Sequence, residues 1–163
     1  MTPEGTSILA DIVPLSGSSS PEQLTAWNDN LFFTAVTADK GREMYRYSAV
    51  DLTTTQGVQL WKSNGSPAGT APVKVINSFS GSLPLDFQNV NGKLVFTAIT
   101  NTSGRELWIS DGTNAGTKQL RNIGPGVLGG QITPQAVFEN ELYFSAFDGL
   151  LGRNCFISGI NGD

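Results

Sequence analysis

Three short apolar segments recur along the chain with the same order of residue types. Each runs from Leu through an apolar residue, Phe, and Thr or Ser to Ala, at 31–35, 94–98 and 142–146. Thr97 and Ser145 hold the same place and are 48 residues apart, whereas Thr34 and Thr97 are 63 apart. A fixed spacing of this size is typical of a structural repeat. The pattern therefore predicts three copies of one unit, the first carrying an insertion of about 15 residues.

Two further markers keep a constant register with these segments. The first begins with a Gly seven residues after the Thr or Ser: Gly41-Arg42-Glu43, Gly104-Arg105-Glu106 and Gly152-Arg153-Asn154. The second is a Gly-Thr pair with an Ile six residues after the Thr, at 5–12, 69–76 and 116–123. Three markers with constant spacing rarely occur together by chance. They therefore strongly indicate a repeat.

The middle copy predicts four short strands. The Asn91-Gly92 pair is a strong hairpin signal, and Arg105 to Ser110 alternates between two faces. The predicted strands are 87–90, 93–99, 105–110 and 117–123. Four antiparallel strands in about 48 residues match one blade of a β-propeller. No segment has a helical apolar period, so the fold class is all-β, with β-propeller blades.

The markers set the boundaries of the predicted blades. Blade 1 is expected at about 21–77, blade 2 at about 84–123 and blade 3 at about 134–163. The third strand of blade 1 is expected at Gly41 to Tyr45, with a second version of that strand at 59–65. The insertion, at about 48–57, would then lengthen the hairpin between the third and fourth strands.

The fourth strand of the third copy is expected from the other end of the chain. The spacing after Ser158 places the next Gly-Thr marker at position 164, one past the last residue, while the first marker supplies a strand at 6–12. Three repeats permuted by one strand leave edges that a second chain can pair. We therefore expect a head-to-tail dimer that closes into a six-bladed ring. The main alternative is that the chain is a segment of a longer repeat array.

Composition excludes several classes of function. The net charge of −4 argues against nucleic acid. The chain has no His, the commonest general base, and its single Cys155 excludes an internal disulfide and a Cys-rich zinc site. No calcium-binding loop is present. We expect no enzymatic activity, no cofactor and no metal.

We expect neither a membrane-spanning segment nor a signal peptide in this sequence, which leaves open a cytoplasmic protein or an exported one whose signal has been removed. No apolar stretch approaches the roughly 20 residues of a transmembrane segment. The first five residues are neither basic nor apolar, so they do not form a signal peptide.

The segment from Glu106 to Thr117, ELWISDGTNAGT, resembles the signature of bacterial ELWxxDGT-repeat proteins. The hairpin turn, the Phe-Thr-Ala strand and the Gly-Thr strand fit that repeat too, so the resemblance covers nearly the whole chain. The first copy departs from it at 59–66 and the third at 154–160. The resemblance implies propeller-like repeats in a secreted or cell-surface protein, with a binding or scaffold role.

Asp111, Gly112 and Thr113 form the polar end of that signature. A tight turn, with Asp capping the backbone and Gly at positive φ, explains them better than a ligand loop does. The other copies replace the Asp by Asn64 and Gly159, which favours the structural interpretation.

Aromatic side chains are the candidate ligand-binding residues, because propellers of the lectin type stack sugars on aromatic rings between blades. The candidates are Trp27, Trp61 and Tyr47. Trp27 is the strongest, because Val90 and Phe138 occupy its place in the other copies.

Other conspicuous residues are given structural roles. The charged residues of Arg42-Glu43 and Arg105-Glu106 are expected to form cross-strand ion pairs on a solvated strand face rather than a charged ring around a channel. Trp108 is expected to pack between blades, since its place is aromatic in every copy. Cys155 falls at the place of Leu107 and is expected to be buried.

Three functions remain open at this stage. The first is a non-enzymatic propeller subunit for protein–protein or surface assembly, by self-association or with other subunits. The second is a lectin-like module that binds glycans between blades. The third and most remote is a hydrolase that uses only carboxylates.

Overall fold

The structure is a computed structural model that describes residues 12, 18–37, 57–149 and 152–158. Within these ranges the chain forms eleven β-strands and no helix. The strands are β1 (Glu22–Trp27), β2 (Asn30–Thr37), β3 (Gly57–Ser63), β4 (Ala71–Lys74), β5 (Leu85–Val90), β6 (Lys93–Thr100), β7 (Gly104–Ser110), β8 (Lys118–Arg121), β9 (Thr133–Phe138), β10 (Glu141–Phe147) and β11 (Arg153–Ser158).

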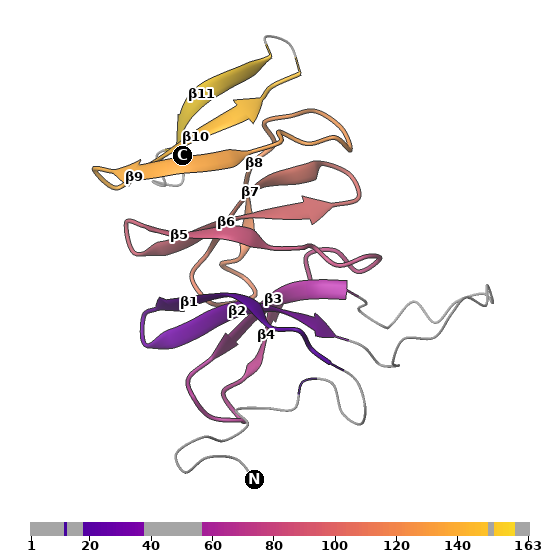
Figure 1. The fold of residues 1–163 in the computed structure, drawn as a ribbon, viewed down its shortest axis with the longest axis vertical. Helices are drawn as coiled ribbons and strands as arrows, with labels where there is room; N and C mark the ends of the chain where they lie inside the picture. The colour runs from indigo at the N-terminus through magenta and orange to yellow at the C-terminus, as the bar shows by residue number, and fades with distance from the viewer. Residues whose placement is uncertain (1–11, 13–17, 38–56, 150–151, 159–163) are drawn as a thin grey trace, which may run out of the picture.

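The strands form three separate sheets that stack as layers in chain order (Figure 1). The first sheet has the order β1-β2-β3-β4 and the second β5-β6-β7-β8, while the third has the order β11-β10-β9. All neighbouring strands are antiparallel. The prediction of an all-β chain of repeated antiparallel sheets is confirmed. The strand expected at 6–12 lies outside the described residues.

Each sheet begins with a hairpin whose two turn residues have positive φ. These pairs are Asn28 and Asp29, Asn91 and Gly92, and Glu139 and Asn140. Positive φ at both positions is the geometry that follows the natural twist of two antiparallel strands, and Asn, Asp and Gly adopt it most easily. The turn predicted from Asn91-Gly92 is therefore present, and the other copies reproduce it with different residues.

The third strand of the first sheet is not where the marker placed it. Gly57–Ser63 pairs with β2, with Phe33 opposite Trp61, as Phe96 lies opposite Trp108 in the second sheet. The extra residues of the first copy therefore precede its third strand, and the hairpin after that strand has the ordinary length. The third strand was therefore predicted wrongly at Gly41 to Tyr45, a stretch that lies outside the described residues. The second version of that strand, predicted at 59–65, is the one that pairs with β2.

Two apolar clusters hold the layers together. The second sheet contributes side chains to both clusters, because its strands alternate between two faces. One cluster joins the first two sheets through Trp27, Phe32, Leu60, Val73, Leu94, Phe96, Ala98 and Trp108. The other joins the second and third sheets through Val90, Val95, Leu107, Ile109, Ile132, Leu142, Phe144 and Ala146. Because neighbours along β7 point to opposite faces, the middle sheet is covered on both sides. The predicted packing role of Trp108 between blades is confirmed.

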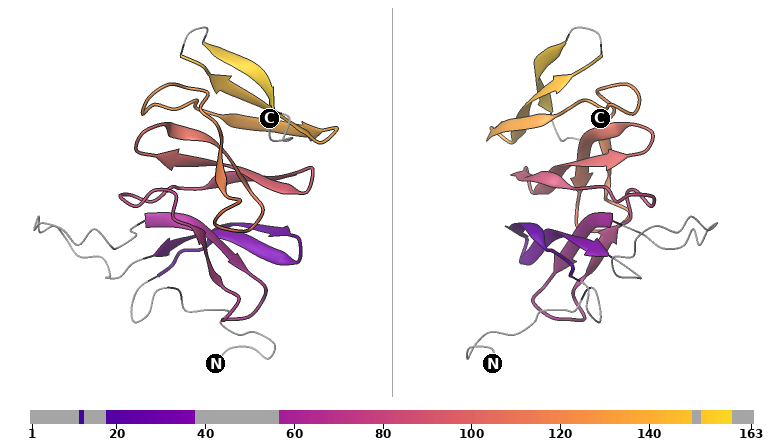
Figure 2. Two further views of the ribbon diagram at one scale, coloured as in Figure 1. Left: turned by 180° about the vertical axis from the view of Figure 1, so that it is seen from behind. Right: turned by 45° about the vertical axis from the view of Figure 1, so that its right-hand side comes forward.

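The links between sheets use the same backbone contacts twice. The Ser82 amide donates to the Val58 carbonyl of the preceding sheet, and its carbonyl accepts from Ile99 of the next. Gly130 does the same, donating to Arg105 and accepting from Phe147. Views from two further directions show the three layers and the segments that connect them (Figure 2). The repeat thus fixes the spacing of the layers as well as their internal pairing.

Candidate functional site

The turn between β7 and β8 is closed by its own side chains. The Oδ1 atom of Asp111 accepts hydrogen bonds from the backbone amide of Thr113 at 2.9 Å and from its hydroxyl at 2.7 Å. These donors hold the pKa of the Asp111 carboxyl below its ordinary value. The Ser110 and Thr117 hydroxyls, 2.7 Å apart, join the ends of the turn. The side chains of Ser110, Asp111, Thr113 and Thr117 therefore all have partners within the turn.

The equivalent turn of the first sheet has the same network despite its different sequence. Asn64 Oδ1 accepts from the amide and hydroxyl of Ser66 at 3.1 and 2.8 Å, and Ser63 pairs with Thr70 at 2.7 Å. An Asn side chain can replace Asp because only its oxygen is used. This agreement favours the structural interpretation of Asp111, Gly112 and Thr113.

The turn of the second sheet also rests on the first sheet. A Cβ added at Gly112, whose φ is +84°, would lie 3.4 Å from the ring of Phe32 and 3.8 Å from that of Trp27. Lys62 of the first sheet donates to the Gly112 carbonyl at 2.8 Å. The turn is therefore part of the contact between blades, and Gly is needed there for its backbone conformation.

The carboxylate of Glu106 is fully buried where the chain leaves the second sheet. It accepts hydrogen bonds from the backbone amides of Ile123 and Gly124, both at 2.9 Å. Burial raises the pKa of Glu106 above its ordinary value, and these amides, with that of Gly130, oppose the rise. Arg105 instead bonds to Thr97. The expected cross-strand ion pair on a solvated face was wrong, because the Glu106 carboxylate is buried and its described partners are backbone amides.

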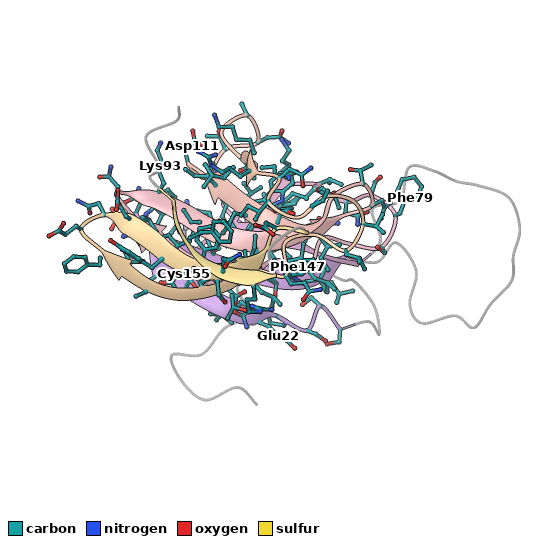
Figure 3. All side chains as sticks on the ribbon, turned by 90° about the horizontal axis from the view of Figure 1, so that it is seen from above. Glu22, Phe79, Lys93, Asp111, Phe147 and Cys155 are labelled. Carbon is teal, nitrogen blue, oxygen red and sulfur yellow. The ribbon has the colours of Figure 1, made fainter. Side chains whose placement is uncertain are left out.

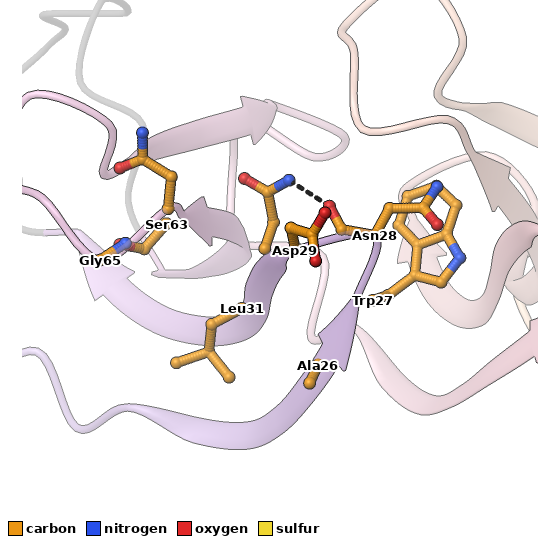
Figure 4. Close-up of a pocket in the computed structure, with 9 residues that line it drawn as sticks. Ala26, Trp27, Asn28, Asp29, Leu31, Ser63 and Gly65 are labelled. Atoms are coloured by element: carbon orange, nitrogen blue, oxygen red, sulfur yellow. Dashed lines mark hydrogen bonds between the residues drawn. The ribbon is translucent and has the colours of Figure 1, made fainter.

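An open hollow lies at the outward face of the first sheet, near the β1–β2 hairpin (Figure 4). Its volume is about 480 Å³. It is lined by Ala26, Trp27, Asn28, Asp29, Asn30, Leu31, Ser63, Asn64 and Gly65. The Asn30 amide donates to the Asn28 carbonyl at 2.8 Å, which braces the rim. We call this hollow the Gly65 pocket.

The predicted ligand-binding residues do not gather at one place. Trp27 lines the Gly65 pocket, but its side chain is only 6 % exposed and packs against Phe32 with ring centroids 5.3 Å apart. Trp61 is half-buried and stacks on Phe33 at 6.4 Å. Tyr47 lies outside the described residues. Neither tryptophan presents a broad open ring face for stacking.

The outward face of the third sheet carries exposed apolar side chains that the sequence did not single out. Phe138 is 60 % exposed and lies 6.4 Å from Tyr143, centroid to centroid. Cys155 is exposed on the same sheet (Figure 3). The prediction of a buried Cys155 was wrong, because β11 belongs to a sheet with no described layer outside it. The repeat pattern carries no signal for this surface, because the equivalent positions Trp27 and Leu107 are buried in the other sheets.

The described ranges contain no group of three or more Cys, Asp or Glu side chains placed to hold a metal ion. No helix long and apolar enough to cross a membrane occurs in them.

Fold and site together define an all-β repeat protein made of stacked antiparallel sheets. Comparison with known proteins adds no further identity, since no family model, curated protein or solved structure matches the chain.

Proposed function

We propose that the chain is a non-enzymatic β-propeller subunit whose function is assembly, first of all with a second copy of itself. The observation that carries this proposal is the repeated contact between layers, in which each pair of sheets shares one apolar cluster. A stack of such repeats has two different end faces, and each corresponds to one side of the contact between neighbouring sheets. Head-to-tail contact joins these two unlike faces. Closure after two chains gives six blades, within the usual range of about four to eight.

The third sheet supplies a second argument for association. β11 has no described strand on its outer side, whereas β3 and β7 are followed there by β4 and β8. The Gly-Thr marker at 69–76 and 116–123 accompanies those two outer strands, and its remaining copy lies at 5–12. We propose that residues 6–12 of a second chain add the outer strand to the third sheet, which removes an exposed edge.

The contacts of the signature residues support the resemblance to ELWxxDGT-repeat proteins. Glu106 holds the link to the next blade, Trp108 fills the cluster between blades, and Asp111 closes the turn. These three residues of the signature thus each have a structural role in a blade. We propose membership of that class, and with it a secreted or cell-surface location.

Glycan binding is the second candidate, and the Gly65 pocket is the observation that favours it. Asn28, Asp29 and Asn64 place amide and carboxylate groups around this hollow, and such groups hydrogen-bond sugar hydroxyls. The small exposed fraction of Trp27 weakens the candidate, because sugar stacking needs an open aromatic face. Assembly therefore remains the stronger proposal.

Hydrogen exchange at low and high protein concentration tests the proposed assembly. We expect the amides of residues 6–12 to gain protection as concentration rises, and Leu9→Asp to abolish that gain, because Leu9 holds the register place of the buried Val73. Lack of any concentration dependence would contradict the proposal. Saturable binding on a glycan array, lost in Asn64→Ala, would favour the second candidate instead.

A further inference from the structure

We propose that the head-to-tail contact has a defined anchor: the rings of Phe138 and Tyr143 of one copy seat in the Gly65 pocket of a second copy. This inference rests on the proposed self-association and names the residues that make it. The contact between the first two sheets provides the template, because the same elements meet there within a single chain.

Inside the chain, the template consists of a ring pair and a glycine turn. Trp27 and Phe32 lie 5.3 Å apart, inclined at 58°, on the face of the first sheet that meets the second. The turn of the second sheet lies on these rings, with Gly112 as its point of contact. Both rings are almost completely buried as a result.

The third sheet repeats the ring pair in the same register. Trp27 lies opposite Asn30 across its hairpin, as Phe138 lies opposite Glu141. Phe138 and Tyr143 are inclined at 58°, as in the template, with centroids 6.4 Å apart. Phe138 is 60 % exposed where its counterpart Trp27 is 6 % exposed. The third sheet therefore offers the rings without the turn that covers them.

The first sheet repeats the glycine turn without the rings. Gly65 has φ +89°, close to the +84° of Gly112, but a Cβ added at Gly65 would meet no atom within 4 Å. Open space beside it forms the Gly65 pocket, with Leu31 on its wall. Phe33 and Ala35, further along the same face, are already buried. The unfilled part of the outward face of the first sheet is thus the Gly65 pocket. By analogy with the template, a ring pair would fill it.

The opposite end of the interface has a template as well. Ser82 and Gly130 each donate a backbone hydrogen bond to the third strand of the preceding sheet. Ser19 holds the same place before the first sheet, because its carbonyl accepts from Val36 as those of Ser82 and Gly130 accept from Ile99 and Phe147. In the proposed contact its amide faces the Arg153 carbonyl of the second copy.

Exposed side chains between these two ends fit the same plan. Leu24 is 61 % exposed, while Phe87, in the same register place of the second sheet, packs against the first cluster. Cys155 is exposed, while Leu107, in its place, is buried. Docking of the third sheet on the first covers Leu24 and Cys155 together.

The proposed anchor is tested by mixing two variants, each of which changes one side of the contact between copies. Phe138→Asp damages the ring side of the contact and Leu24→Asp damages the other side. Each variant alone is expected to weaken self-association by about tenfold or more, as for a buried apolar anchor. A mixture of the two recovers association, because one of the two contacts in the mixed ring is then undamaged. The matched control is Phe79→Asp, which changes an exposed Phe away from Cys155 (Figure 3) and should leave association unchanged.

Reaction of the single thiol locates the contact on the molecule. Maleimide labelling of Cys155 is expected to slow about tenfold as wild-type protein passes from monomer to dimer, and not to slow in Phe138→Asp. Dimers with a freely reacting Cys155, or no recovery on mixing, would overturn the proposed anchor while leaving self-association intact. A wild-type chain that stays monomeric would instead overturn the proposed function. Unchanged circular dichroism of both variants establishes that they fold.

Discussion

At the scale of single residues, buried polar atoms show which positions the fold depends on. The Glu106 carboxylate and the Gln59 amide hold the same place in consecutive sheets and are both buried. Gln59 donates to the Asn77 carbonyl and accepts from Ser82, so both side chains attach a sheet to the segment that leaves it. The sequence marker Gly-Arg-Glu identified Glu106 but not its role, because its partners lie 17 and 18 residues away.

Substitution of Glu106 should separate its hydrogen bonds from its charge. We expect Glu106→Ala to destabilise the fold by about 2 kcal/mol or more, since it leaves buried amides without an acceptor. Glu106→Gln should cost less, because its carbonyl oxygen keeps one of the two bonds. Urea unfolding of the three proteins measures the difference; equal losses in the two variants would contradict this role.

The raised pKa of Glu106 predicts the sign of a pH effect. The folded state binds the proton more tightly than the unfolded state, so this contribution to stability is present below the ordinary Glu value of 4.5. It is lost as pH rises through the raised folded value. The free energy of unfolding should therefore fall with rising pH above 4.5 in the wild type more than in Glu106→Gln. The same slope in both proteins would assign the effect to other groups.

Trp108 offers a second test at this scale. Its ring lies in the first cluster, and its indole N–H is buried with no described hydrogen-bond partner. Phe156 stands in the same place in the third sheet. Trp108→Phe should therefore cost less than about 1.5 kcal/mol, whereas Trp108→Ala should cost about 3–5 kcal/mol through the cavity it leaves. Thermal unfolding compares the two, and equal costs would place the ring outside the packed interface.

At the scale of strands and turns, the spacing of the Gly-Thr marker follows from packing. A Cβ at Gly116 would lie about 2 Å from the Asp111 carboxylate, and one at Gly69 equally close to Asn64. The signature therefore needs Gly at this distance from its Asp or Asn. The repeat was visible in the sequence because such local constraints recur in every copy.

Gly116→Ala is expected to open the turn between β7 and β8 and to cost about 1–3 kcal/mol, as in other overpacked sites. In an Asp111→Ala background the same change should cost less, since the carboxylate that collides with the new methyl is gone. A double-mutant cycle of unfolding free energies measures the coupling. Strict additivity would show that the two side chains do not meet.

The element that sequence reasoning misplaced was the third strand of the first sheet. Two stretches competed for it, since 41–45 carries the marker and 57–63 carries the alternation that pairs with β2. The marker reports only a short stretch of sequence. Pairing of the third strand also requires that a short turn connect it to the Gly-Thr pair that follows. The distance from Trp61 to Thr70, equal to that from Trp108 to Thr117, contains the information that decides between them.

At the scale of the whole molecule, the sequence predicts how many sheets form and the structure shows how they stack. Alternation on β7 specifies two covered faces for the middle sheet, which the two clusters confirm. The exposure of Phe138 and Leu24 was not predictable from the repeat, because the same register places are buried elsewhere. Their exposure depends on the position of their sheets at the two ends of the stack.

Native mass spectrometry at micromolar concentration tests the central claim most directly. Proposed closure predicts a discrete species of two chains, each of 17.3 kDa, which Phe138→Asp shifts to the single chain. A wild-type protein that remains a single chain, or that grows into open oligomers without a preferred size, would contradict the account.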